Sequence, residues 1–214
     1  MFLLISKHLY INLHQYRIML KAEFVYRELL RQCFEGRKRE FTQKGLAAGL
    51  RMSLSNVNHA VRPLRRMNAI KVNPRNFRVV SPKKILYYWA SNRNLQKDIA
   101  YSTRVEAPVR EIEKRMPGGS VFTGYSGYWF RFSDAPADYS EVYVYAEDLG
   151  EMRARFPESK RPANLFALQK DELMREYSGV APMGLLFADL WNMPEWYAKD
   201  FLKALEARVD AVLE

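Results

Sequence analysis

Apolar side chains recur at helical spacing at the start of the chain. In residues 21–35, "KAEFVYRELLRQCFE", one face collects Phe24, Val25, Leu29, Leu30 and Cys33. This spacing predicts an amphipathic helix. Residues 41–50, "FTQKGLAAGL", predict a second, shorter helix with Thr42 as its N-cap. After a short turn, Ser53 or Ser55 is placed to cap a third helix.

The stretch 52–70, "MSLSNVNHAVRPLRRMNAI", divides into two faces when it is placed on a helical wheel. One face is apolar and predicts a buried stripe made of Val57, Ala60, Val61, Leu64 and Met67. The opposite face is polar and carries Ser55, His59, Arg62 and Arg66, with Asn58 and Arg65 on its edge. Pro63 lacks the N–H that would bond the His59 carbonyl, which costs about 3 kcal/mol inside a helix. We expect Pro63 to bend this helix rather than end it.

Two short extended segments follow, "AIKV" and "FRVV", with the turn signal "NPRN" between them. They predict a β-hairpin with Arg75 and Asn76 near its tip. The order helix, helix, turn, helix, hairpin is typical of a winged helix-turn-helix domain. A fourth helix is expected from Ser81, with Pro82 at its first position. We place a linker near "AYSTRV".

The second half alternates between helical and extended patterns. We expect helices in "EAPVREIEKRM", "EDLGEMRARF" and "KDELMREY", and strands at the start of "SVFTGYSGYWFRF" and in "EVYVYA" and "NLFALQ". "APMGLLFADLWN" looks largely extended, and a long helix starts at Pro194. The predicted fold class is α/β, or α+β overall. Its parts are an N-terminal extension (residues 1–18), a winged helix-turn-helix domain (19–104) and a small α/β domain (105–214).

The distribution of charge separates these two halves. Residues 1–104 contain 21 Lys and Arg against 5 Asp and Glu, a net charge of +16, whereas residues 105–214 contain 13 against 19, a net charge of −6. The first half is therefore the one that could attract a polyanion. The alternative is a basic face that is merely solvated.

The amino-acid composition limits the compartment and the kinds of site that are expected. One cysteine, Cys33, cannot form an internal disulfide, and with only three histidines the sequence predicts no metal or cofactor site. The first twenty residues are too interrupted by polar residues for a membrane helix or a signal peptide. These residues are expected to form either an additional helix or strand that packs on the body of the protein, or an over-extended start of the sequence, in which case Met19 is the true initiator. We expect a cytoplasmic protein.

Catalytic patterns are weak. "GYSGYW" has Gly124 and Ser126 but not the full serine-nucleophile elbow, and no histidine follows His59. A nucleotidyltransferase would need paired carboxylates after such a Gly-Ser turn, and Asp189 alone is a poor substitute. We therefore expect no enzyme. Two alternatives stay open: a nucleotide-handling enzyme using Asp189, and a protein-interaction adaptor using the aromatic side chains of the second half. Those are Tyr125, Tyr128, Trp129, Tyr139, Tyr143, Tyr145, Trp191, Trp196 and Tyr197.

DNA binding is the function that the first half favours. Residues near the start of the third helix would meet base edges, and the arginines further along and in the hairpin would mostly meet phosphates. The candidate DNA-binding residues are Lys44, Ser53, Ser55, Asn56, Asn58, His59, Arg62, Arg65, Arg66, Lys71, Arg75 and Arg78. The expected partner is double-stranded DNA, with no membrane partner, and a homodimer stays open.

The stretch "LAAGLRMSLSNVNHAVRPLRRMNAI" resembles the winged-helix domains of microbial transcriptional regulators. With "VFTGYSGYWF", "EVYVYAED" and "MGLLFADLWNMPEWYAKDFLKALE", the second half resembles the C-terminal domain of AbiEi-type antitoxins of type IV toxin–antitoxin systems. This resemblance implies an N-terminal domain that represses its own operon. It also implies a C-terminal α/β domain, distantly similar to nucleotidyltransferases, that acts against a toxin partner. The extension before residue 19 departs from that pattern.

Overall fold

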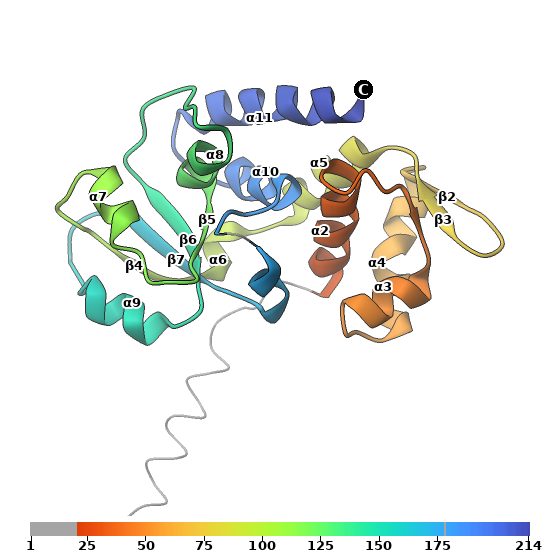
Figure 1. Ribbon diagram of the computed structural model, residues 1–214, viewed down its shortest axis with the longest axis horizontal. Helices are drawn as coiled ribbons and strands as arrows, with labels where there is room; N and C mark the ends of the chain where they lie inside the picture. Colours follow the sequence, from red (N-terminus) through yellow and green to blue (C-terminus); the bar gives the residue numbers. More distant parts are fainter. Residues whose placement is uncertain (1–20, 178) are drawn as a thin grey trace, which may run out of the picture.

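The computed structural model describes residues 21–177 and 179–214, and it combines helices with two β-sheets (Figure 1). The predicted α/β class is confirmed. The N-terminal extension, residues 1–18, lies outside the described residues. Among the helices described, none is both long and apolar enough to cross a membrane.

The first part of the chain forms the predicted succession of helices and hairpin. Helices α2 (Lys21–Phe34), α3 (Gln43–Gly49) and α4 (Leu54–Arg66) precede the antiparallel strands β2 (Ile70–Val72) and β3 (Phe77–Val79). Strand β1 (Glu40–Phe41), which the sequence did not indicate, pairs with β3 and gives the order β1-β3-β2. Helix α5 (Pro82–Asn92) follows, and Figure 1 shows the β2–β3 hairpin projecting at the edge of the molecule beyond α4.

Side-chain caps decide where α3 and α4 begin. Thr42 accepts a hydrogen bond from the Gly45 amide at 2.9 Å, and Ser53 accepts one from the Asn56 amide at 3.2 Å. Ser53, not Ser55, is therefore the N-cap of α4. The predicted buried stripe is confirmed for Val57, Ala60, Val61 and Leu64, and Met67 is half-buried. Helix α4 continues through Pro63 to Arg66, so the proline does not end it.

The second sheet has the strand order β4-β7-β6-β5. Its strands are β4 (Ile99–Thr103), β5 (Val121–Thr123), β6 (Val142–Ala146) and β7 (Leu165–Gln169), and only β6 and β7 among these run parallel. Alternation along β6 sends Val142 and Val144 to one core and Tyr143 and Tyr145 to the other. Every residue of β6 is buried because helices cover both faces of the sheet.

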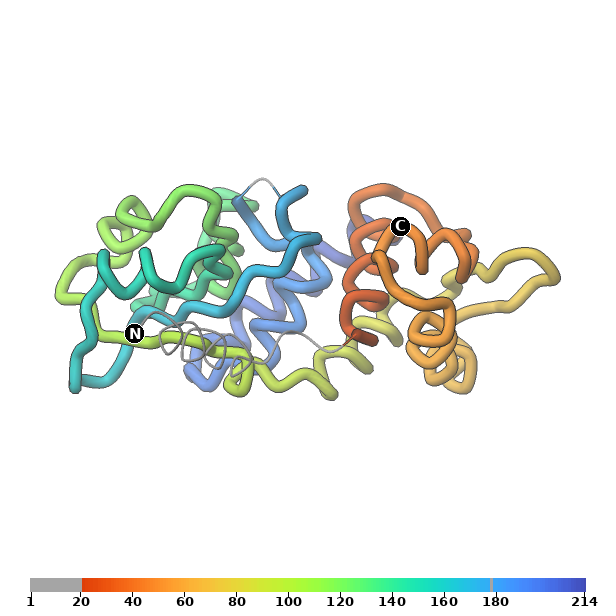
Figure 2. The backbone as a smooth tube through the Cα atoms, turned by 90° about the horizontal axis from the view of Figure 1, so that it is seen from below, coloured from red at the N-terminus to blue at the C-terminus, as the bar shows by residue number. Residues whose placement is uncertain are grey.

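The remaining helices lie on the two sides of this sheet. Helices α7 (Val109–Lys114) and α9 (Leu149–Arg155) cover one face, and α8 (Gly124–Phe132) and α10 (Met183–Trp191) cover the other, with α11 (Ala198–Leu213) outside them (Figure 1). Two short elements complete the chain, α6 (Leu95–Asp98) and the 3₁₀-helix η1 (Glu172–Glu176). Figure 2 shows the blue C-terminal helices lying beside the red α2 at the middle of the molecule.

Two expectations from the sequence are wrong. Residues 181–192 are not extended, because they contain α10, whose residues are buried except Trp191 at its end. A helix buried on all sides has no polar face, so its sequence lacks the 3.6-residue alternation that reveals a surface helix. The expected linker "AYSTRV" is also wrong, because it contributes strand β4, which pairs with β7. Hydrogen bonding to a strand some sixty residues away leaves little local signal.

One apolar core joins the two halves of the chain. Helix α10 packs on α2 and α5 as well as on α8 and α11, and the buried cluster around it includes Leu30, Trp89, Leu186 and Phe201. The division into residues 19–104 and 105–214 stays a prediction. The long helix expected from Pro194 begins four residues later, at Ala198.

Candidate nucleic-acid interface

Three elements bring the predicted DNA-binding side chains to one end of the molecule: the start of α3, the exposed side of α4 and the β2–β3 hairpin. Most of these side chains are exposed, and Asn56 alone among the twelve is half-buried. The exposed members are Lys44, Ser53, Ser55, Asn58, His59, Arg62, Arg65, Arg66, Lys71, Arg75 and Arg78. Exposure alone is also what a solvated basic face would show, so the arrangement of the residues matters more.

A groove of about 460 Å³ runs between α4 and the hairpin and reaches the start of α3. Five of the predicted residues line it: Lys44, Asn58, Arg62, Arg65 and Arg75. Residues from three separate segments thus face one concave surface. The cations among them are Lys44, Arg62, Arg65 and Arg75.

The other predicted residues do not line this groove. Ser53 and Asn56 instead line a wider cavity, about 1370 Å³, between the α3–α4 turn and the ends of β6 and β7. Ser55, His59, Arg66, Lys71 and Arg78 lie outside both spaces. On the helical wheel, Arg62 shares the polar face with Ser55, His59 and Arg66. In the structure, Arg62 instead lines the groove together with Asn58 and Arg65.

The groove lies in a segment with almost no acidic residues. Residues 37–80 contain eleven Lys and Arg and one acidic residue, Glu40, so the net charge is 11 − 1 = +10. Glu40 lies 3.8 Å from Arg78, and both side chains are largely exposed. Within residues 21–177 and 179–214, no ion pair involves the other basic side chains of the candidate set, which are Lys44, Arg62, Arg65, Arg66, Lys71 and Arg75. Their positive field is therefore left uncompensated by nearby carboxylates.

Hydrogen bonds hold the polar side chains of the groove in place. The Asn58 amide nitrogen donates to Gln43 Oε1 at 3.3 Å, which links α4 to the first turn of α3. In the hairpin turn, the Asn73 amide nitrogen donates to Asn76 Oδ1 at 2.8 Å. The Asn73 backbone N–H also donates to the Asn76 carbonyl at 2.8 Å. The first bond joins α4 to α3 and the other two close the hairpin turn, and none of them occupies an arginine.

The residues that line the groove but were not among the predicted set include Gln43, Leu54 and Val72. Leu54 and Val72 are exposed apolar side chains, with 54% and 50% of their surface accessible. Leu54 is the first residue of α4, so it shares a face with Asn58, Arg62 and Arg65 at i+4, i+8 and i+11. Choosing Ser53 as the cap would have revealed this alignment from the sequence.

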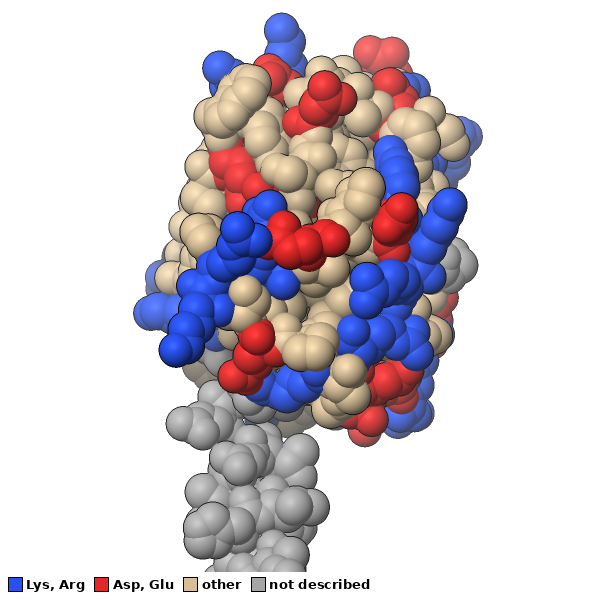
Figure 3. Space-filling model, turned by 90° about the vertical axis from the view of Figure 1, so that its left-hand side faces the viewer, with Lys and Arg blue, Asp and Glu red and all other residues tan. Residues whose placement is uncertain are grey.

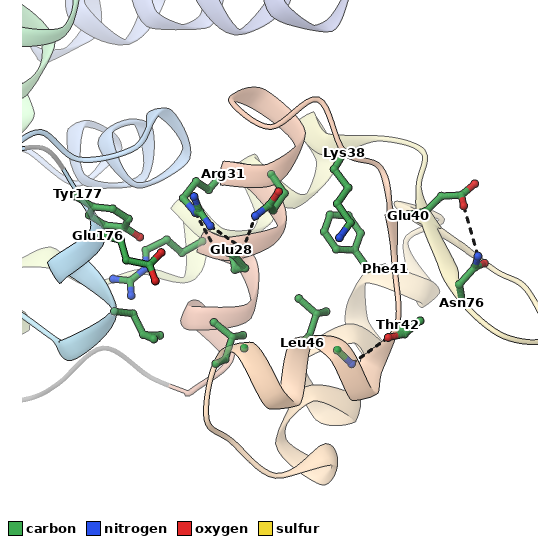
Figure 4. Close-up of a pocket in the computed structure, with 16 residues that line it drawn as sticks. Glu28, Arg31, Lys38, Glu40, Phe41, Thr42, Leu46, Asn76, Glu176 and Tyr177 are labelled. Atoms are coloured by element: carbon green, nitrogen blue, oxygen red, sulfur yellow. Dashed lines mark hydrogen bonds and ion pairs between the residues drawn. The ribbon is translucent and has the colours of Figure 1, made fainter.

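A further cavity, about 440 Å³, lies between α2, α3, β1 and η1 (Figure 4). Its arginines are already paired: Arg31 with Glu28 at 2.9 Å, and Arg27 with Asp171 at 2.6 Å. Lys38 lies 5.5 Å from the centre of the Phe41 ring. The walls therefore combine both charge signs and define no single ligand chemistry.

The residues considered for catalysis are buried. Ser126 and Asp189 expose none of their surface. Asp189 is held by Arg93 Nε at 2.7 Å, Thr123 Oγ1 at 2.7 Å and Tyr145 OH at 2.8 Å, so its carboxylate oxygens are occupied by protein donors. Gly124 has φ +60°, and a Cβ there would lie 2.3 Å from Met193 Cε, so its glycine is explained by packing. In the described part of the chain, no group of three or more His, Cys, Asp or Glu could hold a metal ion.

The aromatic residues of the second half serve mostly as core. Tyr125, Tyr128, Tyr143, Tyr145 and Tyr197 are buried, whereas Trp191 and Trp196 are 45% and 75% exposed. The end of the molecule that carries α7 and α9 also differs from the groove in charge. Figure 3 shows Lys and Arg beside Asp and Glu there. The ion pairs of this half include Arg153–Glu158 and Arg155–Glu151, both at 2.8 Å.

The groove between α4 and the hairpin is therefore the best-defined candidate site among the described residues. No family model, curated protein or solved structure matches the chain, so a function has to be inferred from the groove itself.

Proposed function

We propose that this protein is a sequence-specific, double-stranded-DNA-binding transcriptional regulator and not an enzyme. In this proposal α2 to α4 and the β2–β3 hairpin form a winged helix-turn-helix unit. The observation that carries the proposal is the groove in which Lys44, Asn58, Arg62, Arg65 and Arg75 meet without neutralising carboxylates.

The dimensions and chemistry of DNA suit this surface. The major groove is about 12 Å wide and admits an α-helix. With α4 inserted, its first two turns present Ser55, Asn58 and His59 to base edges. The adjoining sugar–phosphate backbone then runs between α4 and the hairpin, where Arg62, Arg65 and Arg75 contact phosphates. Each neutralised phosphate releases counterions, so the affinity falls steeply with salt.

Fluorescence anisotropy with labelled DNA from upstream of the protein's own gene tests the proposal. The wild-type protein should bind this DNA more tightly than a scrambled duplex of equal length. Arg62→Ala combined with Arg65→Ala should weaken binding more than tenfold. It should also reduce the slope of log K against log salt by about two, since each phosphate contact contributes roughly 0.9.

A charge-matched control separates a groove effect from a loss of net charge. Lys160→Ala combined with Lys199→Ala removes two exposed cations from the second half. This control should leave affinity and slope nearly unchanged. Equal weakening by both double variants would contradict the groove assignment, and no binding to any duplex would overturn the proposed function. Arg66→Ala alone, which lies outside the groove, should have a smaller effect than Arg62→Ala.

The second half is proposed to bind a protein partner, which for an AbiEi-type antitoxin is a toxin made by the neighbouring gene. The exposed Trp191 and Trp196 support this, because tryptophan is favoured at the centre of protein interfaces.

A regulator of this kind would act in the cytoplasm, beside the DNA, and as a homodimer if its operator is palindromic. Co-expression with the neighbouring gene product tests the contact: Trp196→Ala should reduce co-purification, whereas the exposed Lys199→Ala should not.

A further inference from the structure

We infer that Leu54 contacts the 5-methyl group of a thymine in the bound DNA, so that Leu54 selects a T·A base pair at one position of the recognised site. This inference rests on the proposed DNA-binding function and adds a specificity-determining residue to it. It starts from an apolar side chain that the packing of the protein does not explain.

Leu54 is outside the core of the protein. The buried stripe of α4 consists of Val57, Ala60, Val61 and Leu64, whereas Leu54 keeps 54% of its surface accessible. The other exposed side chains of α4 are polar or basic, namely Ser55, Asn58, His59, Arg62, Arg65 and Arg66. Leu54 is therefore the one exposed apolar side chain on this described helix.

The position of Leu54 is also the one from which base edges are reached. It is the first residue of α4, and the N-terminal residues of an inserted helix are those that contact bases. The cap fixes this position, because Ser53 accepts the Asn56 amide and so sets where the first turn begins. Leu54 lines the groove together with Asn58, one helical turn further along, which the proposed function places at a base edge, so Leu54 lies beside a base contact on the same face of α4.

The major groove offers few apolar groups to such a side chain. Its base edges present hydrogen-bond donors and acceptors, and the 5-methyl of thymine is the apolar exception among the standard bases. A leucine facing any other base edge would desolvate polar groups without bonding them. Next to Leu54, the Asn58 amide keeps its oxygen free of the Gln43 bond and can accept from a neighbouring base.

Uracil substitution removes only this methyl group from the DNA. A binding site is first selected from a random duplex pool with the wild-type protein, and each thymine is then replaced by uracil in turn. For the wild-type protein, one replacement should weaken binding about fourfold, as expected for one methyl group returned to water. For Leu54→Ala, the same replacement should change the affinity by less than 1.5-fold.

Val80→Ala is the matched control, because it truncates another exposed apolar side chain, one that does not line the groove, and it should keep the fourfold sensitivity. Circular dichroism checks that both variants fold. If Leu54→Ala keeps the full sensitivity, or if no thymine in the site responds in the wild-type protein, the inference is overturned while the proposed function stands. If the pool yields no bound duplex at all, the proposed function fails and the inference fails with it.

Discussion

Arg93 donates a hydrogen bond from Nε to Oδ1 of Asp189 at 2.7 Å, and neither side chain is accessible to solvent. Arg93 follows α5 in the first half, whereas Asp189 belongs to α10 in the second. The same guanidinium also donates to Glu23 at 2.7 Å and to the Tyr145 hydroxyl at 2.9 Å, and it lies 3.1 Å from Asp98. The two halves are thus joined by a buried polar network as well as by apolar packing.

Removing the guanidinium should destabilise the whole protein. In Arg93→Met, the buried carboxylates of Glu23, Asp98 and Asp189 lose their common cation, so we expect the free energy of unfolding to fall by about 3–5 kcal/mol. Urea denaturation followed by far-UV circular dichroism measures this change. Arg51→Met is the control, because Arg51 pairs with Glu172 in solvent at 3.6 Å. The control should cost less than about 1 kcal/mol. Equal costs for both variants would contradict the structural role of the network.

Ionisation of the single thiol, Cys33, should lower the free energy of unfolding at alkaline pH. Burial raises the pKa of the Cys33 thiol from 9.0 to about 11, against the opposing charge of Arg39, which lowers it. Between these values the folded state keeps a proton that the unfolded state has lost, so stability falls as the pH rises from 9 to 11. The loss is about 2–3 kcal/mol over this window.

Urea midpoints at several pH values, measured for the wild-type protein and Cys33→Ala, isolate this contribution from that of the tyrosines. The variant should be less stable at neutral pH but should lose less stability between pH 9 and 11. Parallel pH profiles would show that the thiol does not contribute.

The start of α4 should be sensitive to Ser53 and insensitive to Ser55. Ser53→Ala removes the acceptor of the Asn56 amide and should lower the free energy of unfolding by about 1 kcal/mol. Ser53→Asn supplies another capping oxygen and should restore most of the loss. Ser55→Ala should have little effect, because Ser55 is exposed and does not cap the helix. Urea midpoints distinguish these variants. A larger loss of stability in Ser55→Ala than in Ser53→Ala would show that Ser53 is not the cap.

Replacing the proline inside α4 should stabilise the protein. Pro63 lies within Leu54–Arg66 and cannot donate to the His59 carbonyl. Pro63→Ala restores this donor and relieves the ring's contact with the same carbonyl, against a small entropic gain of the unfolded chain. We expect a net gain of about 2 kcal/mol, seen as a higher melting temperature. A lower melting temperature would mean that the surrounding packing depends on the proline.

The elements at the protein surface could be predicted because their sequences carry local signals. The apolar stripe of Val57, Ala60, Val61 and Leu64 marks α4, and Thr42 marks the start of α3. The turn "NPRN" marks the hairpin. Such signals depend on contacts with water and with residues a few positions away, so one chain segment suffices to read them.

The candidate site was predicted as a set of residues but not as a surface. Charge and helical spacing identified Arg62, Arg65 and Arg75 as basic and exposed. Only the packing of the hairpin beside α4 shows that these three line one groove. Gln43, Leu54 and Val72 line it too. The Ser53 cap would have aligned Leu54 with Asn58 on one face of α4, but nothing in the segments of Gln43 and Val72 marks them as neighbours of that face.

The sequence by itself determined the surface helices, the Thr42 cap, the hairpin and the concentration of positive charge in the first half. The tertiary structure decided that "MGLLFADLW" is a buried helix, that "IAYST" is a strand, and that Arg93 joins three carboxylates from separate helices. The physical reason is the distance along the sequence over which each interaction acts. Caps and amphipathic faces act within a few residues, whereas burial on all sides, strand pairing and buried ion pairs depend on groups that only folding brings together.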